Sequence, residues 1–208
     1  MIASIVRKLS PHWPQMRPNF TWKFNDEKEE FDLIVADPRT HSLLICEMRW
    51  TIQPGDPREV AQRKKNCFEK VSQLERKVEW LRPRLHTAVT EIFGIETTLE
   101  NPWEIVGLVV VDGFGGVMSP NGDLPIMPAR IFERAMPQVE SLQVLKNWSK
   151  SLAWLPQEDV FFEMKWRELE LEGKRINYQG MIPLQERPDF LQHIDRTIMA
   201  AKTQTSRG

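Results

Sequence analysis

The sequence predicts an α/β fold, with a central mixed β-sheet flanked by helices. Two apolar segments, residues 31–35 and 43–50, are joined by a short turn and predict a β-hairpin. A third segment, residues 103–111, is apolar at nearly every position, which is typical of a central strand covered on both faces. Between them, an amphipathic pattern over residues 57–83 predicts a long helix. This order of strands and helices favours a mixed sheet with helices on its faces.

Length and composition favour one domain. The chain has 208 residues, of which 41% are hydrophobic, enough for one substantial core. We expect a single domain over residues 1–208, with a core over about residues 22–155 and a C-terminal β extension over about residues 156–200. No segment reaches the roughly 18 apolar residues that span a bilayer, and the N-terminus does not resemble a secretory signal. The expected location is therefore the cytoplasm, without a membrane partner.

The first hairpin and the arm before it are predicted from local signals. Pro11, Pro14 and Pro18 interrupt the first 20 residues, which predicts a short helix followed by an irregular arm. Residues 36–42 predict a turn, in which Pro38 sets the backbone angle and Asp37 can accept hydrogen bonds.

The long helix has clear signals at both ends. Asp56 and Pro57 are typical of an N-cap followed by the first helical position, and Pro83 predicts the end. The apolar stripe between them consists of Val60, Cys67, Val71, Leu74, Val78 and Leu81.

The last third of the chain predicts helices and then a hairpin. Residues 128–136 and 138–153 predict two helices separated at Pro137. The alternation over residues 160–177 predicts a C-terminal β-hairpin that turns at residues 172–174. Residues from about Ala200 onward are polar, and we expect them to be loose. The glycine-rich residues 112–116 lack phosphate-binding spacing and predict a plain turn.

Charge is unevenly distributed although the net charge is only −1. Acidic residues gather at residues 26–32, and residues 57–84 are strongly basic. Such a pairing suits a cation site that faces a phosphate backbone, but a solvated helix face explains the basic residues equally well. The basic residues of that segment are Arg58, Arg63, Lys64, Lys65, Lys70, Arg76, Lys77, Arg82 and Arg84.

Three side chains of the first hairpin are candidates for chemistry. Glu47 and Arg49 share one face of an apolar strand, where a carboxylate is costly to bury unless it is paired or bound to metal. The turn brings Asp32 opposite the Glu47 end. Two carboxylates at one end of a hairpin suit Mg²⁺, which lowers the pKa of a bound water. The alternative is a structural ion pair between Glu47 and Arg49.

The residues Glu30-Phe31-Asp32-Leu-Ile-Val, a turn, and Leu-Leu-Ile-Cys-Glu47-Met48-Arg49-Trp resemble the core of the PD-(D/E)XK nuclease superfamily, in its Mrr/RecB-like branch. The resemblance implies a restriction-endonuclease-like αβββαβ core and hydrolysis of DNA phosphodiester bonds. It also implies Mg²⁺, with Mn²⁺ as a substitute, held by Asp32, Glu47 and the carbonyl of Met48. Members often carry a glutamine on the following helix, where Gln73 stands here.

Two positions depart from the family pattern. Phe31 stands at a variable position usually written as proline, and Arg49 replaces the usual lysine. An arginine keeps the charge but does not give up its proton. Arg49 therefore either stabilises charge electrostatically or marks a weakened activity.

The preferred hypothesis is a metal-dependent deoxyribonuclease of a defence, restriction or repair system. Asp32, Glu47, Arg49 and Gln73 would be catalytic. DNA would contact the basic helix, through Arg63, Lys64, Lys70 and Lys77. The first alternative is a nuclease-like DNA-binding or assembly module that has lost chemistry. A hydrolase acting on RNA or nucleotides is another. A homodimer or a larger multi-component system would fit either role.

Other candidate groups favour structural explanations. Cys46 and Cys67 lie in apolar patterns and are expected to be buried free thiols, while the four histidines lack metal-ligand spacing. The segment Glu163-Met-Lys165-Trp repeats the pattern at Glu47 without a partner aspartate, and we interpret it as structural. Glu30 is an additional candidate ligand because it shares the parity of Asp32. Among the eight tryptophans, Trp13, Trp22 and Trp154 suit either an interface or, more commonly, the core.

Overall fold

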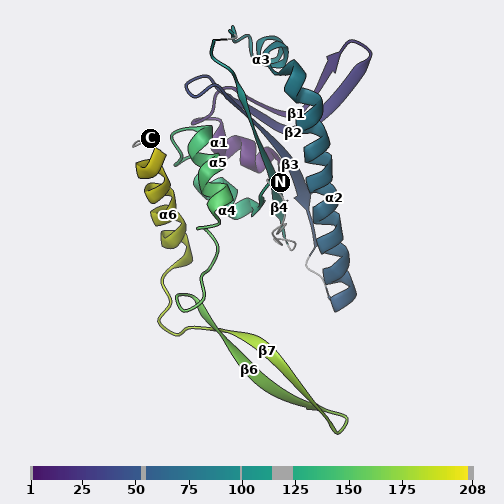
Figure 1. Cartoon of the computed structure of the whole chain (residues 1–208), viewed down its shortest axis with the longest axis vertical. Helices are drawn as coiled ribbons and strands as arrows, with labels where there is room; N and C mark the ends of the chain where they lie inside the picture. Colours follow the sequence, from purple (N-terminus) through teal and green to yellow (C-terminus); the bar gives the residue numbers. More distant parts are fainter. Residues whose placement is uncertain (1, 53–54, 99, 114–123, 206–208) are drawn as a thin grey trace.

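The computed structural model describes residues 2–52, 55–98, 100–113 and 124–205. Its helices are α1 (Ile2–Leu9), α2 (Pro57–Leu81), the 3₁₀ turn η1 (Arg82–Arg84), α3 (Leu85–Phe93), α4 (Ala129–Ala135), α5 (Leu142–Ser151) and α6 (Phe190–Thr205). Its strands are β1 (Met16–Phe24), β2 (Glu27–Asp37), β3 (Ser42–Trp50), β4 (Glu104–Asp112), β5 (Ile126–Pro128), β6 (Phe162–Leu171) and β7 (Lys174–Pro183). Figure 1 shows their arrangement.

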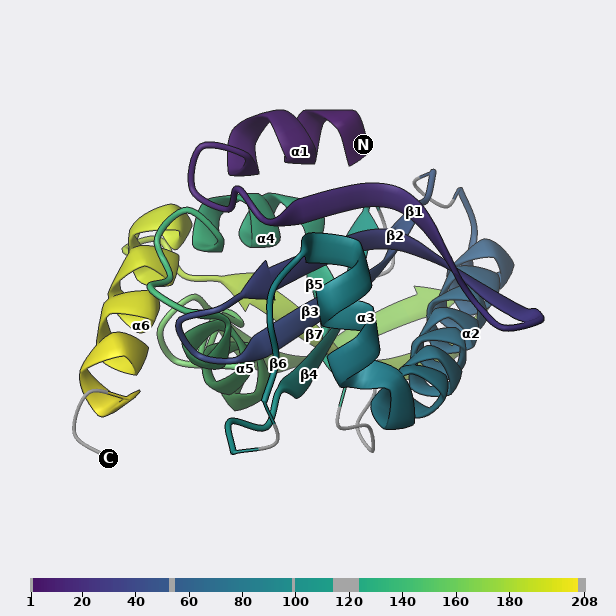
Figure 2. The same ribbon diagram turned by 90° about the horizontal axis from the view of Figure 1, so that it is seen from above.

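The main body is a five-stranded mixed sheet in the order β1-β2-β3-β4-β5. The first two pairings are antiparallel, and β3-β4 and β4-β5 are parallel. One cluster of buried apolar residues packs α2 and α3 against one face of the sheet, and another packs α1, α4, α5 and α6 against the other face (Figure 2). This confirms the predicted class, a mixed sheet flanked by helices. None of the described helices is both long and apolar enough to cross a membrane.

The turn between β2 and β3 is held by Asp37, as its position in the sequence suggested. Its buried carboxylate accepts hydrogen bonds from the backbone N–H and the Nε of Arg39, at 3.2 and 2.9 Å, and from the hydroxyl of Thr40. It also accepts one from the backbone N–H of Leu142, at 3.1 Å. Asp37 therefore ties the hairpin turn to the start of α5.

Helix α2 begins and ends where its sequence signals lie. The side chain of Asp56 accepts hydrogen bonds from the backbone N–H groups of Arg58 and Glu59, at 2.7 and 2.9 Å. The helix ends at Leu81, and Pro83 lies in the following 3₁₀ turn. Asp56 and Pro83 therefore mark the start and the end of α2, the helix that carries most of the basic residues.

Strands β1 and β2 change the face that they present at one point. Asn19 has a left-handed φ of 46°, and the pairing of β1 with β2 skips Asn19 and Asp32. On one side of this point Leu33 packs in the cluster under α4 and α5, whereas on the other side Phe31 packs under α2. A left-handed residue breaks the regular alternation of a strand, which explains the change.

Two expectations about the chain ends were wrong. The segment expected as an irregular arm contains β1, an edge strand in which Pro18 is tolerated because its missing N–H costs no ladder bond. The end expected to be loose from about Ala200 lies in α6, whose Ile194 and Ile198 are fully buried. Helix α6 also occupies the last part of the expected β extension, which otherwise contains β6 and β7. The short strand β5 was not predicted. Most of the glycine-rich loop expected at residues 112–116 lies outside the described residues.

The predicted C-terminal hairpin is present but longer than expected. Strands β6 and β7 pair antiparallel from Phe162↔Pro183 to Leu171↔Lys174, and the turn has left-handed residues at Glu172 and Gly173. They form a separate two-stranded sheet, which extends beyond the main body in Figure 1. Trp13, Trp22 and Trp154 are buried in the core, whereas Trp166 of this hairpin is 74% exposed.

Candidate functional site

Glu47 is a buried carboxylate at the point where β2 and β3 separate. The ladder between these strands stops at Leu33↔Cys46, and the next opposed positions are Asp32 and Glu47. Only 1% of Glu47 is exposed. A charged group with so little water contact requires partners, and α2 provides them.

Two lysines of α2 hold the Glu47 carboxylate. Lys70 Nζ donates to Glu47 Oε2 at 2.8 Å, and Lys77 Nζ donates to Oε1. The spacing of seven residues places both lysines on nearly the same line along the helix. Lys77 is buried, whereas the side chain of Lys70 is 19% exposed. Of the two lysines that contact Glu47, Lys70 is therefore the one that reaches solvent.

Lys77 also links Glu47 to β2. Its ammonium donates to the carbonyl of Glu30, lies 3.9 Å from the carboxylate of Glu29, and sits 5.8 Å from the ring centre of Phe31. Arg76 contacts the same Glu29 carboxylate through two hydrogen bonds, the longer of which is 3.2 Å. The hydrogen bond to Glu29 is the main reason that the pKa of Arg76 is raised.

These contacts form a chain of alternating charges, in which the bases come from α2 and the acids from β2 and β3. Its order is Lys70, Glu47, Lys77, Glu29 and Arg76. Each carboxylate has two cationic neighbours, which is the condition under which a buried charge is tolerated.

Asp32 completes the polar end of the hairpin. Its Oδ2 accepts a hydrogen bond from the backbone N–H of Met48 at 2.7 Å, in place of a ladder bond where the strands separate. In a strand, the N–H and C=O of one residue point to the same side, so the Met48 carbonyl is also directed toward the Asp32 side. The oxygens predicted as ligands therefore come from adjacent positions.

The negative charges of Asp32 and Glu47 also act on the thiol of Cys46. Burial raises the pKa of Cys46 well above its ordinary value, and the charges of Asp32 and then Glu47 raise it further. Cys67 on α2 is also buried, and burial raises its pKa while the charge of Arg49 opposes that shift. Both cysteines are buried, as predicted, and no disulfide joins them.

The structure does not bring every predicted residue to Glu47. Arg49 is exposed and forms no ion pair with Glu47, which removes the structural pair considered as the alternative; its charge acts on Cys67 instead. Gln73 is exposed and lies about 40–60° farther around the helix than the two lysines. Arg63 and Lys64 lie nearer the start of α2, where Lys64 is 5.8 Å from the ring centre of Phe68. Their role in binding DNA stays a prediction.

Two members of the charge chain were missed from the sequence. Regular alternation favoured Glu30 as the additional acid, but Glu30 is exposed and Glu29 is buried. The left-handed Asn19 beside this point explains the error, since the faces of β1 and β2 exchange there. The available signal for Arg76 was its position next to Lys77 in the basic helix.

The donor set fits a hard divalent cation in its chemistry. Two carboxylates and a backbone carbonyl are ligands that Mg²⁺ accepts, and it usually completes its shell with water. Within the described ranges, no group of three or more His, Cys, Asp or Glu side chains is placed to hold a metal. Because each Glu47 oxygen already accepts from a lysine, a cation there competes with the ammonium groups of Lys70 and Lys77.

No protein-family model, curated protein or solved structure matches the chain.

Proposed function

We propose that the chain is a metal-dependent deoxyribonuclease built on a restriction-endonuclease-like core. The order α1-β1-β2-β3-α2-β4, with two antiparallel pairings followed by a parallel one, agrees with the αβββαβ core that the resemblance implies. The proposal rests chiefly on one observation. Asp32 and Glu47 are the first opposed residues beyond the β2–β3 ladder, beside a cationic helix.

Each residue has a distinct part in the proposed chemistry. Asp32, Glu47 and the Met48 carbonyl would hold Mg²⁺. The bound ion would lower the pKa of a water molecule and neutralise negative charge on the scissile phosphate. Lys70 would supply an ammonium group beside Glu47. A lysine can donate a proton, whereas Arg49 cannot, because an arginine keeps its proton. Lys77, buried between two carboxylates, is a positioning residue that fixes the Glu47 side chain.

The DNA backbone would approach along α2. Arg49, Arg63 and Lys64 are the cations expected to contact phosphates, which would make binding weaken with salt. Gln73 lies on the solvent side of the same helix, within the surface that the DNA would follow.

The second candidate is a nuclease-like DNA-binding module without chemistry. It is favoured by the hydrogen bonds of Lys70 and Lys77 to both Glu47 oxygens, since a carboxylate saturated by ammonium groups needs no metal. Arg49 in place of lysine favours it as well.

Cleavage of supercoiled and linear DNA distinguishes the two candidates. We expect cutting with Mg²⁺ or Mn²⁺, none with EDTA, and a loss of at least about 100-fold in Asp32→Asn and Glu47→Gln. The matched control is Glu96→Gln, which removes one exposed carboxylate elsewhere and should cut like the wild type. DNA binding without cutting under any metal, unchanged in both variants, would leave the binding module as the better account.

A further inference from the structure

Part of strand β4 has an open edge. Strand β5 pairs only with Val109–Val111, so no other described strand covers that edge over residues 104–108. The N–H of Glu104 donates toward β3, to His41, whereas the N–H of Val109 donates to Pro125 on the opposite side. Because N–H directions alternate along a strand, Ile105 and Gly107 direct their backbone groups to the open edge.

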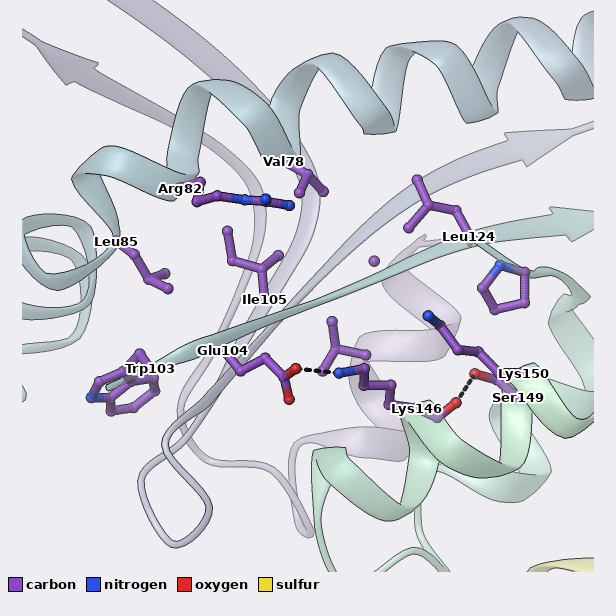
Figure 3. Close-up of a pocket in the computed structure, with 13 residues that line it drawn as sticks. Val78, Arg82, Leu85, Trp103, Glu104, Ile105, Leu124, Lys146, Ser149 and Lys150 are labelled. Atoms are coloured by element: carbon purple, nitrogen blue, oxygen red, sulfur yellow. Dashed lines mark hydrogen bonds and ion pairs between the residues drawn. The ribbon is translucent and has the colours of Figure 1, made fainter. Parts of the chain in front are cut away.

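A groove with two different walls lies over this edge. It has a volume of about 430 Å³ and is bounded by α2 on one side and α5 on the other (Figure 3). The wall on the α2 side presents Val78 of α2, Arg82 of η1 and Leu85 of α3. The α5 side presents Lys146, which pairs with Glu104, and Lys150. The groove thus combines strand backbone that pairs with no described strand, an apolar wall and a basic wall.

The tip of strand β6 in the β6–β7 hairpin presents acidic and apolar side chains, which are complementary to the basic and apolar walls of the groove. This tip alternates Glu168, Leu169, Glu170, Leu171 and Glu172, so the acids and the leucines lie on different faces. The acidic face also carries Arg175, which lies 3.6 Å from Glu168. Leu169 and Leu171 are 49% and 56% exposed. A two-stranded ribbon cannot bury such side chains by itself, and an exposed strand edge favours pairing with another strand.

We propose that β6 of a second copy of this chain adds to the open edge of β4. Strand addition would satisfy the backbone groups of Ile105 and Gly107, with leucines on the α2 wall and glutamates on the lysines of α5. Each copy has one hairpin and one groove, so two copies can exchange arms and close as a dimer. The hairpin extends away from the body of its own chain, which leaves the second copy as its acceptor (Figure 1).

The charges of the hairpin favour a protein surface over nucleic acid. Residues 162–183 carry four acids (Glu163, Glu168, Glu170, Glu172) and four bases (Lys165, Arg167, Lys174, Arg175), so the hairpin has no net charge. A ribbon that binds a phosphate backbone needs an excess of positive charge.

A charge exchange between two variants tests this pairing. Variant one is Glu168→Lys/Glu170→Lys in the hairpin, and variant two is Lys146→Glu/Lys150→Glu in the α5 wall of the groove. By light scattering after gel filtration, we expect the wild type to be a dimer and each variant alone to be a monomer. An equimolar mixture should recover the dimer, because each altered surface then meets its complement.

Controls separate lost pairing from lost folding. Circular dichroism and the melting temperature check the fold of both variants, and Glu96→Lys/Glu100→Lys makes the same charge change on exposed residues outside both surfaces. A wild-type monomer at about 100 µM, where micromolar affinities populate a complex, would overturn the proposal. So would a dimer that survives either variant, or a mixture of the two that stays monomeric.

Discussion

Lys77→Met is expected to destabilise the protein by about 3 kcal/mol, at the lower end of the cost of breaking a buried ion pair. Lys77 is 7% exposed and contacts both Glu29 and Glu47. Its loss leaves two buried carboxylates with one cation each, which is why the lower end of the range applies. For a chain of this length, the change corresponds to a fall of about 6–12 °C in Tm.

The matched control lies at the other end of the same charge chain. Arg76 also pairs with Glu29, but its side chain is 60% exposed, so Arg76→Met should cost no more than about 1 kcal/mol. The double variant Glu47→Leu/Lys77→Met should lower the free energy of unfolding by less than the sum of the two single changes. Each single change removes one partner of the buried Glu47–Lys77 pair, whereas the double change removes both. Urea unfolding measures the wild type, the single variants Lys77→Met, Arg76→Met and Glu47→Leu, and the double variant. A Lys77→Met value equal to that of Arg76→Met would contradict the described network.

Lys70→Ala is expected to separate cation affinity from cleavage. Lys70 occupies Glu47 Oε2, so its removal should tighten the binding of Mn²⁺ while lowering cleavage at saturating cation by about 100-fold. The two effects have opposite sign because the same ammonium competes with the ion and stabilises charge on the phosphate.

Lys28→Ala provides the comparison for this result. It removes one exposed lysine from β2 and should leave both measurements unchanged. Cleavage that rises together with Mn²⁺ affinity in Lys70→Ala would show that Lys70 only blocks the site, and would remove its proposed role.

Local signals predicted the elements that carry the site. Asp56 and Pro57 mark the start of α2, and the turn at Pro38 places Asp32 opposite Glu47. These features depend on neighbouring residues, so a single sequence contains them. Strand β1 was obscured because Pro18 argues against a strand in general, although an edge position tolerates it.

The contacts within the site depend on tertiary packing. Lys70 and Lys77 reach Glu47 only because of how α2 docks on β3 and β4, which no local pattern specifies. Glu29 and Glu30 could not be told apart either, since the exchange of faces follows from the left-handed Asn19 in the neighbouring strand. Helix α6 was missed because its buried positions, Ile194 and Ile198, stand among polar residues.

Direct measurement of divalent cation binding tests the central claim, that Asp32 and Glu47 form a metal site. Mn²⁺ binding would be followed by calorimetry and by electron paramagnetic resonance in the wild type, Asp32→Asn and the exposed control Glu96→Gln. We predict one bound Mn²⁺ in the wild type and the control, and its loss in Asp32→Asn with the fold retained. A folded wild type that binds no Mn²⁺, or an Asp32→Asn variant that binds it equally well, would contradict the claim.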